Sequence, residues 1–199
     1  MVGFLGILNH IKIKFMEIQN LGVDGPYLIE PKVFKDDRGY FFESFNEREF
    51  REKIGYVEFV QDNESRSSYG VLRGMHFQKP PYTQAKLVRV VNGAVLDVVI
   101  DLRKNSETYG KIWSVYLSGE NKKQFFVPRG FAHGFVSLRD DTIFQYKCDN
   151  YYKKESEGGL LWSDNDLLSH WNKYVSLNDI KLSEKDLNNP KLNDLNNPF

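Results

Sequence analysis

Residues 86–103 read KLVRVV-NG-AVLDVVIDLR, so two runs rich in β-branched residues stand on either side of Asn92 and Gly93. An Asn-Gly pair between such runs is typical of a two-residue β-hairpin turn. Pairing Val91 with Ala94 would place one set of side chains on a single face: Lys86, Val88, Val90, Val95, Asp97 and Val99. Buried charges of opposite sign persist when they are paired or functional. A lysine and an aspartate on this valine-rich face therefore indicate a candidate site.

A second hairpin is predicted over residues 133–148, with its turn at 140–141. If Arg139 pairs with Thr142, one face carries a histidine and three aromatic residues: His133, Phe135, Phe144 and Tyr146. This register is an assumption, because a shift of one residue would move the whole set to the opposite face.

Short extended runs separated by turns make up most of the remaining chain. Extended structure is expected over four further ranges: 28–34, 40–45, 59–63 and 158–162. Pro31 interrupts the first of these and favours an edge strand. A helix is predicted over 46–55, where Asn46 can cap the start, Phe50 lies on the apolar side and Gly55 can end it. Many short strands with one or two helices predict a mainly β sandwich or barrel.

Length and composition restrict the class of protein. The 199 residues are 41% hydrophobic, enough for one good core, and we expect a single domain over 16–199. The 27 basic and 27 acidic residues cancel, which argues against a broad electrostatic grip on nucleic acid or an anionic membrane. A single cysteine, Cys148, cannot form an intrachain disulfide and favours a reducing, cytoplasmic setting. Residues 1–15 are interpreted as an N-terminal extension, too short in apolar residues to span a bilayer and unlike a signal peptide.

Two histidines lie in apolar, glycine-containing surroundings. Residues 71–78 read VLRGMHFQ and contain His76, and residues 128–135 read PRGFAHGF and contain His133. Such surroundings suggest a lined pocket more than a wet surface. The intrinsic pKa of an imidazole suits a general base near neutral pH, so our hypothesis is that His76 is a catalytic base.

Eight blocks of sequence occur in a characteristic order: 38–44, 60–63, 73–78, 86–89, 128–135, 146–152, 159–162 and 182–186. In this order they resemble the dTDP-4-dehydrorhamnose 3,5-epimerase family, and the similarity runs from about residue 16 to about residue 190. The resemblance implies a jelly-roll, cupin-like β-barrel with a few short helices and a homodimer that shares strands. It also implies a dTDP-4-keto-6-deoxyhexose substrate and no cofactor.

Epimerisation beside a ketone requires a base, a group that stabilises the enolate oxygen, and an acid on the opposite face. By resemblance, His76 is the base and Asp186 is the carboxylate on its other ring nitrogen. Lys86 is the implied enolate-stabilising cation and Tyr146 the implied acid. The chemistry does not require a metal. The resemblance implies further nucleotide-binding and pocket residues: Arg38, Glu43, Gln61, Asn63, Arg73, Asp97 and His133.

Each of these residues has a simpler explanation when it is considered alone. A histidine such as His76 in an apolar run is more often a core residue, and Lys86 can extend from a strand end to water. Asp186 can form a capping box with Ser183. Asp194 lies in a second copy of the sequence Asp-Leu-Asn-Asn-Pro and is a rival partner for His76.

Other functions remain open to the sequence. A metal-dependent cupin would have a His-x-His motif, but position 78 is glutamine. A mono-epimerase or a ketoisomerase acting on a related dTDP-sugar would keep the same residues. A non-catalytic sugar-nucleotide binding module would not need a base and an acid across one pocket.

Overall fold

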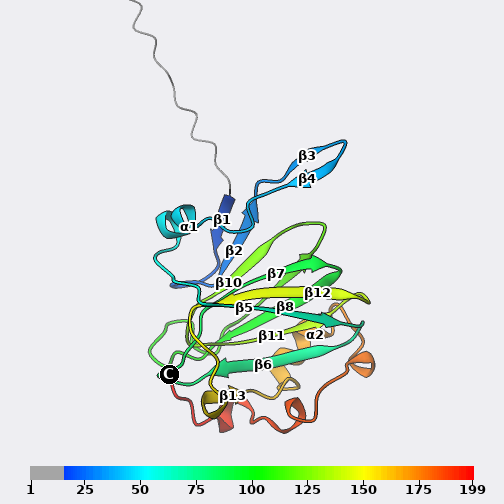
Figure 1. Ribbon diagram of the computed structural model, residues 1–199. Coiled ribbons are helices and arrows are strands. Elements are labelled where there is room, and N and C mark those ends of the chain that lie inside the picture. Colours follow the sequence, from blue (N-terminus) through cyan, green and yellow to red (C-terminus); the bar gives the residue numbers. More distant parts are fainter. Residues whose placement is uncertain (1–15) are drawn as a thin grey trace, which may run out of the picture.

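Two antiparallel sheets face each other in the computed structural model, which describes residues 16–199 (Figure 1). Within these residues, a six-stranded sheet has the order β1 (Met16–Asn20), β2 (Tyr27–Pro31), β10 (Gln124–Val127), β7 (Lys86–Asn92), β12 (Thr142–Cys148) and β5 (Gln61–Ser67). The described part of the facing sheet has five strands in the order β13 (Glu157–Gly159), β6 (Leu72–Gln78), β11 (Phe131–Ser137), β8 (Ala94–Asp101) and β9 (Ile112–Ser118). The remaining strands, β3 (Phe34–Asp36) and β4 (Gly39–Phe41), form a separate ribbon.

Helices are short. The α-helices are α1 (Glu47–Lys53) and α2 (Asn165–Trp171), and the 3₁₀ turns are η1 (Lys154–Ser156), η2 (Leu177–Asp179), η3 (Asp186–Asn188) and η4 (Leu192–Asp194). The expected mainly β, jelly-roll type of fold with a few short helices is confirmed. None of the helices in the described residues is long and apolar enough to cross a membrane. The N-terminal extension proposed for residues 1–15 lies outside the described residues.

Apolar side chains gather in three layers, because both sheets are covered on their outer faces. The layer between the sheets includes Val88 of β7, Val99 of β8 and Phe144 of β12. A second layer lies where α2 and the C-terminal segment cover the five-stranded sheet, with Trp171 fully buried. The third packs α1 onto the six-stranded sheet through Phe50. Every residue of β8 is buried, since this strand faces apolar layers on both sides.

The hairpin predicted over residues 86–103 is wrong. Its two runs are strands, but β7 pairs with β10 and β12, while β8 pairs with β11 and β9 in the opposite sheet. Gly93, at φ +78°, therefore carries the chain from one sheet to the other. The predicted valine face nevertheless exists, because β7 and β8 turn Val88, Val90, Val95 and Val99 toward the same core from opposite sides.

The second predicted hairpin is wrong for the same reason. Strands β11 and β12 lie in different sheets, and residues 138–141 cross between them. Phe135 and Phe144 stack across the space between the sheets, with ring centroids 4.0 Å apart. Pro31 also does not mark an edge strand: β2 lies between β1 and β10, and Pro31 comes at its end.

The predicted helix is confirmed with its cap. Asn46 Oδ1 accepts a hydrogen bond from the Glu49 N–H at 3.1 Å, and Ile54 ends the helix. Phe50 packs edge-on against the rings of Phe59 and Phe126, which fixes α1 on the six-stranded sheet. The apolar side chain at the centre of the sequence pattern is therefore the one that anchors the helix.

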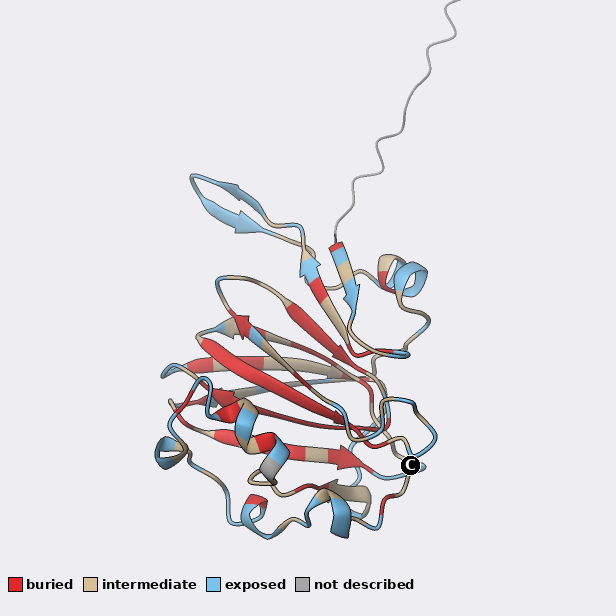
Figure 2. Cartoon of the chain, turned by 180° about the vertical axis from the view of Figure 1, so that it is seen from behind, coloured by how far each residue is buried: buried red, intermediate tan, exposed pale blue. Residues whose placement is uncertain are grey.

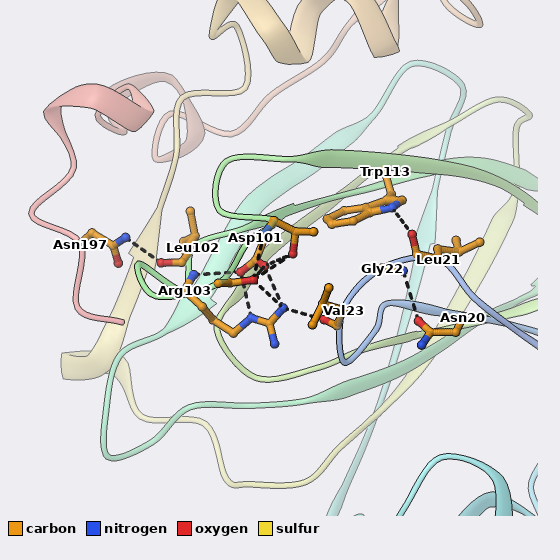
Figure 3. A network of polar contacts seen from close by, with 11 residues as sticks. Asn20, Leu21, Gly22, Val23, Asp101, Leu102, Arg103, Trp113 and Asn197 are labelled. Carbon is orange, nitrogen blue, oxygen red and sulfur yellow. Dashed lines mark hydrogen bonds and ion pairs between the residues drawn. The ribbon is translucent and has the colours of Figure 1, made fainter.

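Polar contacts at the end of β8 tie distant parts of the chain together (Figure 3). The buried Asp101 carboxylate accepts hydrogen bonds from Arg103 Nε at 2.9 Å and Arg103 Nη2 at 2.8 Å. Arg103 Nη2 also donates to the Val23 carbonyl at 3.1 Å, in the loop between β1 and β2. Asn197 Nδ2 donates to the Leu102 carbonyl at 2.7 Å. The network thereby attaches both the first loop and the C-terminal residues to the same end of the barrel.

Candidate active site

Two cavities that share lining residues open where β5, β6, β7 and β12 come together. The larger has a volume of about 600 Å³ and the smaller about 250 Å³. Four residues line both cavities: Asn63, His76, Lys86 and Tyr146. His76 belongs to the five-stranded sheet, whereas the other three belong to the six-stranded sheet that faces it. A molecule between the sheets would therefore have the imidazole on one side and the lysine and tyrosine on the other.

His76 makes a short contact with a carboxylate. Its Nε2 lies 2.5 Å from Asp186 Oδ1. The His76 side chain is 30% exposed and that of Asp186 is 5% exposed, so the imidazole reaches the cavity with the carboxylate behind it. An Nε2–H that donates to Asp186 leaves the lone pair on Nδ1, where a base needs it.

Asp186 is held ionised by its neighbours. Burial acts to raise the pKa of this carboxyl, but hydrogen bonds from His76 and Ser183 outweigh it, and the pKa lies below its usual value. Ser183 Oγ donates to Asp186 Oδ2 at 2.9 Å. It also accepts a long hydrogen bond from the Asp186 N–H at 3.4 Å, which is one of the two bonds of the predicted capping box. The rival Asp194 is exposed in η4, and the partner of His76 is Asp186.

An irregularity in β6 turns Arg73 and His76 toward the same cavity. Residues three apart in a regular strand point to opposite faces. The pairing with β11 shifts between His133/His76 and Phe135/Arg73, so the spacing differs on the two strands. Gly74, at φ +143°, permits the close approach: a Cβ there would lie 2.5 Å from the Cα of Gly134. Gly74 and Gly134, one from each histidine-containing sequence motif, therefore both permit the same close contact between β6 and β11.

His133 forms a second histidine–aspartate pair in the same wall. Its Nε2 lies 2.9 Å from Asp97 Oδ2, and His133 is the register partner of His76. Asp97 is fully buried behind His133 and does not line either cavity, so it acts on the site through His133. Burial raises the pKa of the Asp97 carboxyl above its usual value, although His133 and Lys86 oppose that shift.

Lys86 presents a cation in poorly solvated surroundings. Burial lowers the pKa of its ammonium group, and nearby acidic groups, Cys148 and Asp97 among them, only partly oppose this. Cys148 is its register partner, and burial raises the pKa of that thiol to about 11, which leaves it neutral at pH 7. Within residues 16–199, Lys86 Nζ forms no hydrogen bond or ion pair, and it lies 6.0 Å from the centre of the Tyr146 ring. An ammonium in this position can stabilise an oxyanion that forms in the cavity.

Tyr146 is half-buried beside Lys86. Burial raises the pKa of its phenol, so the hydroxyl keeps its proton at neutral pH and can give it to a carbanion. The Phe144 ring lies beside Tyr146, at 6.1 Å between centroids, and also stacks on His133. The four residues that the sequence placed on one hairpin face therefore meet across the two sheets.

Polar residues of β5 extend the site. Gln61 Nε2 donates to Asn63 Oδ1 at 3.0 Å, and Gln61 Oε1 accepts from the Tyr152 N–H at 3.2 Å. These bonds orient the Asn63 amide at the junction of the two cavities. Arg73 is exposed at the mouth of the larger cavity, with Nε donating to Ser67 Oγ at 3.3 Å.

Besides Asp97, two further predicted substrate residues do not line these cavities within the same chain. Arg38 lies in the turn of the β3–β4 ribbon, where its guanidinium pairs with Asp36 and its side chain is 90% exposed. The ribbon stands away from the barrel, pale blue in Figure 2. Glu43 lies next to the start of α1 and accepts a hydrogen bond from Asn46 Nδ2 at 2.7 Å. Their assignment to substrate binding stays a prediction.

Several cavity residues were missed by the sequence reasoning. They are Ser65, Lys181 and Lys185 in the larger cavity, and Gln84, Cys148, Tyr152 and Glu157 in the smaller one. Cys148 could have been found, because it follows Tyr146 by two residues on the same face of a strand. The position of Lys185 depends on the fold of the C-terminal segment, which has no periodic pattern.

Gln78 holds the backbone at Lys153 through a hydrogen bond. Its Oε1 accepts a hydrogen bond from the Lys153 N–H at 2.8 Å, and the residue is buried. Within the described residues, no group of three or more histidine, cysteine, aspartate or glutamate side chains is placed to hold a metal ion. The absence of a metal from the chemistry stays a prediction.

The chain resembles known proteins over most of its length. Residues 20–194 match the family model described as dTDP-4-dehydrorhamnose 3,5-epimerase. The protein of that name from Shigella flexneri is 52% identical over 168 residues, which cover 84% of this chain and 91% of that protein. The sequence-based expectations of this family and of an epimerase are confirmed by these relationships.

Solved structures agree with the fold. The crystal structure of dTDP-4-dehydrorhamnose 3,5-epimerase from Elizabethkingia anophelis has a TM-score of 0.86 and 53% identity, covering 92% of this chain and 100% of that one. A dTDP-6-deoxy-D-glucose-3,5-epimerase from Legionella pneumophila, in complex with dTDP-4-keto-L-rhamnose, has a TM-score of 0.83 and 45% identity. That match covers 89% of this chain and 93% of the other.

Proposed function

We propose, given that the chain belongs to the dTDP-4-dehydrorhamnose 3,5-epimerase family, that it converts dTDP-4-dehydro-6-deoxy-D-glucose to dTDP-4-dehydro-L-rhamnose. One observation carries the proposal. His76, backed by Asp186 at 2.5 Å, faces Lys86 and Tyr146 of the opposite sheet across a shared cavity. A base and an acid on opposite sides of a substrate are what inversion at carbon requires. We propose that residues 16–199 form one catalytic domain for this reaction.

In this mechanism, His76 Nδ1 takes the proton from a carbon next to the C4 ketone. The electron pair of the broken C–H bond moves to the ketone oxygen and forms an enolate. Lys86 stabilises the negative oxygen, and Asp186 stabilises the imidazolium. Tyr146 then returns a proton from the other face. Solvent re-protonates the phenolate and takes the proton from the His76 imidazolium, which restores both groups. The same cycle at C3 and at C5 inverts both centres without a cofactor.

The larger cavity offers charge for the diphosphate of the substrate. Arg73, Lys181 and Lys185 all line it. An arginine can donate two parallel hydrogen bonds to a phosphate. Gln61, Asn63 and His133, with Asp97 behind it, are proposed to hold the sugar and the adjoining phosphate. The buried, single thiol of Cys148 fits a reducing cytoplasmic setting, which we propose for the enzyme.

The test is incubation with dTDP-4-keto-6-deoxyglucose in D₂O, followed by proton NMR at C3 and C5. We expect deuterium at both positions and signals of the inverted product. Binding without exchange would identify a non-catalytic module and defeat the proposal. Exchange at only one carbon would favour the alternative, a mono-epimerase on a related dTDP-sugar, and migration of the ketone would favour a ketoisomerase.

Tyr146→Phe is expected to slow inversion at C5 by about a hundredfold while proton removal by His76 continues. The phenylalanine keeps the ring in the apolar layer but cannot donate a proton. In D₂O, the C5 hydrogen of the variant should therefore still exchange with solvent, while the inverted product forms much more slowly than in the wild type. An equal loss of exchange and inversion would contradict the role of an acid on the opposite face.

We propose a homodimer in which the β3–β4 ribbon of each subunit reaches the cavity of the other. A two-stranded ribbon alone is at best marginally stable in water. Tyr40 and Phe41 on this ribbon are 57% and 66% exposed, which fits a surface that a second copy covers. This arrangement would bring Arg38 to the partner's substrate.

The dimer predicts complementation between two defective variants. Arg38→Ala lacks the proposed substrate contact and His76→Asn lacks the base. Mixing them should recover activity that neither has alone, because a mixed dimer contains one site with both groups intact. Sedimentation velocity should give twice the mass of the 23.3 kDa chain. A monomer in sedimentation, or no recovery after confirmed subunit exchange, would contradict the shared site.

A further inference from the structure

The segment that carries Asp186 belongs to neither main sheet. It follows a bridge between Lys181 and Val71 and continues through η3, orange to red below β6 in Figure 1. The strand β13 holds it from the side. Lys185 forms an ion pair with Glu157, and the Leu161 N–H donates to the Pro190 carbonyl at 2.8 Å. The position of Asp186 therefore depends on contacts between its segment and residues of β13 and the residues that follow it.

Gly159 is the point at which both halves of the His76–Asp186 pair meet β13. Its Cα is the register partner of His76 in β6. On its other side, the Asn189 side chain lies against it: a Cβ at position 159 would be 2.6 Å from Asn189 Nδ2 and 2.7 Å from Cγ and Oδ1. The φ angle of Gly159 lies outside the left-handed region, so the backbone itself does not demand glycine. Glycine is required at this position because the Asn189 side chain approaches it so closely.

We propose that Gly159 is a positioning residue, whose missing side chain sets the spacing between His76 and Asp186. A methyl group at this position would have to push Asn189 from 2.6 Å to the 3.4 Å at which ordinary contact begins. Asn189 follows η3 directly, so the shift reaches Asp186. The contact between Asp186 and His76 is 2.5 Å long, so a displacement of this size would lengthen it to about 3.3 Å, beyond the usual hydrogen-bond range, and weaken it.

The first test measures deuterium exchange and therefore rests on the proposed function. Gly159→Ala should slow exchange about tenfold to a hundredfold, because catalytic geometry is lost at displacements near 1 Å. The affinity for dTDP should not change. Adding Asn189→Ala removes all three obstructing atoms and should restore the rate. Asn189→Ala alone should match the wild type, since Nδ2 of Asn189 is buried with no hydrogen-bond partner in the described structure. A Gly159→Ala enzyme at full rate, or a double variant without recovery, would overturn the proposal.

Non-additivity provides a second criterion. If Gly159 acts through Asp186, then Gly159→Ala should cause no further loss in an enzyme that already carries Asp186→Asn. An additional loss of the same size in that background would show that Gly159 acts elsewhere, and the proposal would fail.

A third measurement does not depend on activity. Hydrogen bonds from His76 and Ser183 keep the pKa of Asp186 below its usual value against the effect of burial. Weakening the bond from His76 should therefore raise that pKa, which carbon NMR of the labelled carboxyl can follow. We expect the rise in Gly159→Ala and its reversal with Asn189→Ala. An unchanged titration would overturn the proposal even in a protein without epimerase activity, so its failure is distinguishable from failure of the proposed function.

Discussion

His76→Asn is expected to stop the exchange of the substrate's C3 and C5 hydrogens with D₂O, with a loss of roughly a thousandfold or more. Asparagine is chosen because it keeps a polar, uncharged side chain at this position but has no basic nitrogen, while Ser183 still donates to the buried Asp186 carboxylate. What disappears is the lone pair that His76 Nδ1 offers to the cavity. In the wild type, the lowered pKa of Asp186 keeps that carboxyl ionised at neutral pH, so it can stabilise the imidazolium that forms when His76 takes a proton.

A matched substitution is available at His170 of α2. This imidazole accepts or donates one hydrogen bond at 2.9 Å to Ser114 and lines neither cavity. His170→Asn should exchange deuterium at the wild-type rate. The binding of dTDP to His76→Asn, measured by calorimetry, should be unchanged, which separates loss of chemistry from loss of fold. Exchange above a tenth of the wild-type rate in His76→Asn would defeat the assignment of the base.

The sequence could predict which residues face the site but not how the strands that carry them pair. Alternation along a strand is a local property, so Lys86 and Asp97 were each correctly placed on the same side as the valines of their own strand, although the two strands lie in opposite sheets. Strand pairing is decided by contacts between distant segments. The Asn92-Gly93 turn suits a hairpin and also suits a corner between two sheets, and only burial on both faces of β8 selects the corner.

Irregular structure limited the prediction in a second way. Arg73 and His76 share a cavity because β6 departs from regular pairing at Gly74, and period-two reasoning would have separated them. Asp186 reaches His76 from a segment without periodicity, so its role entered through family resemblance alone. Arg38 shows the opposite case. The sequence motif includes Arg38. Within one chain, however, Arg38 lies on an exposed ribbon and does not line the cavity.

Lys86→Met should slow deuterium exchange by about a hundredfold to a thousandfold while making the fold more stable. The two effects have one cause. An ammonium that faces an enolate without competing ion pairs is well placed for catalysis, but it loses hydration when the chain folds. Methionine fills a similar volume and removes that cost. The rate falls because the enolate oxygen then has no cation.

The pH dependence follows from the direction of the pKa shift. Burial is the largest cause and lowers the pKa of Lys86 in the folded state, so the unfolded chain holds this proton more tightly. Between the lowered pKa and about 10.4, the value for a free lysine side chain, the stability of the wild type should rise with pH. Below that window the full cost of burying the charge remains. The methionine variant should lack this rise and exceed the wild type in stability most clearly at neutral pH.

Urea unfolding at a series of pH values, together with exchange rates, tests both effects on the same samples. Lys173→Met is the control, because Lys173 is exposed just after α2 and should change neither quantity. The alkaline limb of the wild-type rate should fall at a lower pH than an ordinary lysine would give, since a neutral Lys86 cannot stabilise an oxyanion. A less stable methionine variant that retains its rate would contradict both arguments, and would place the enolate-stabilising charge on another residue.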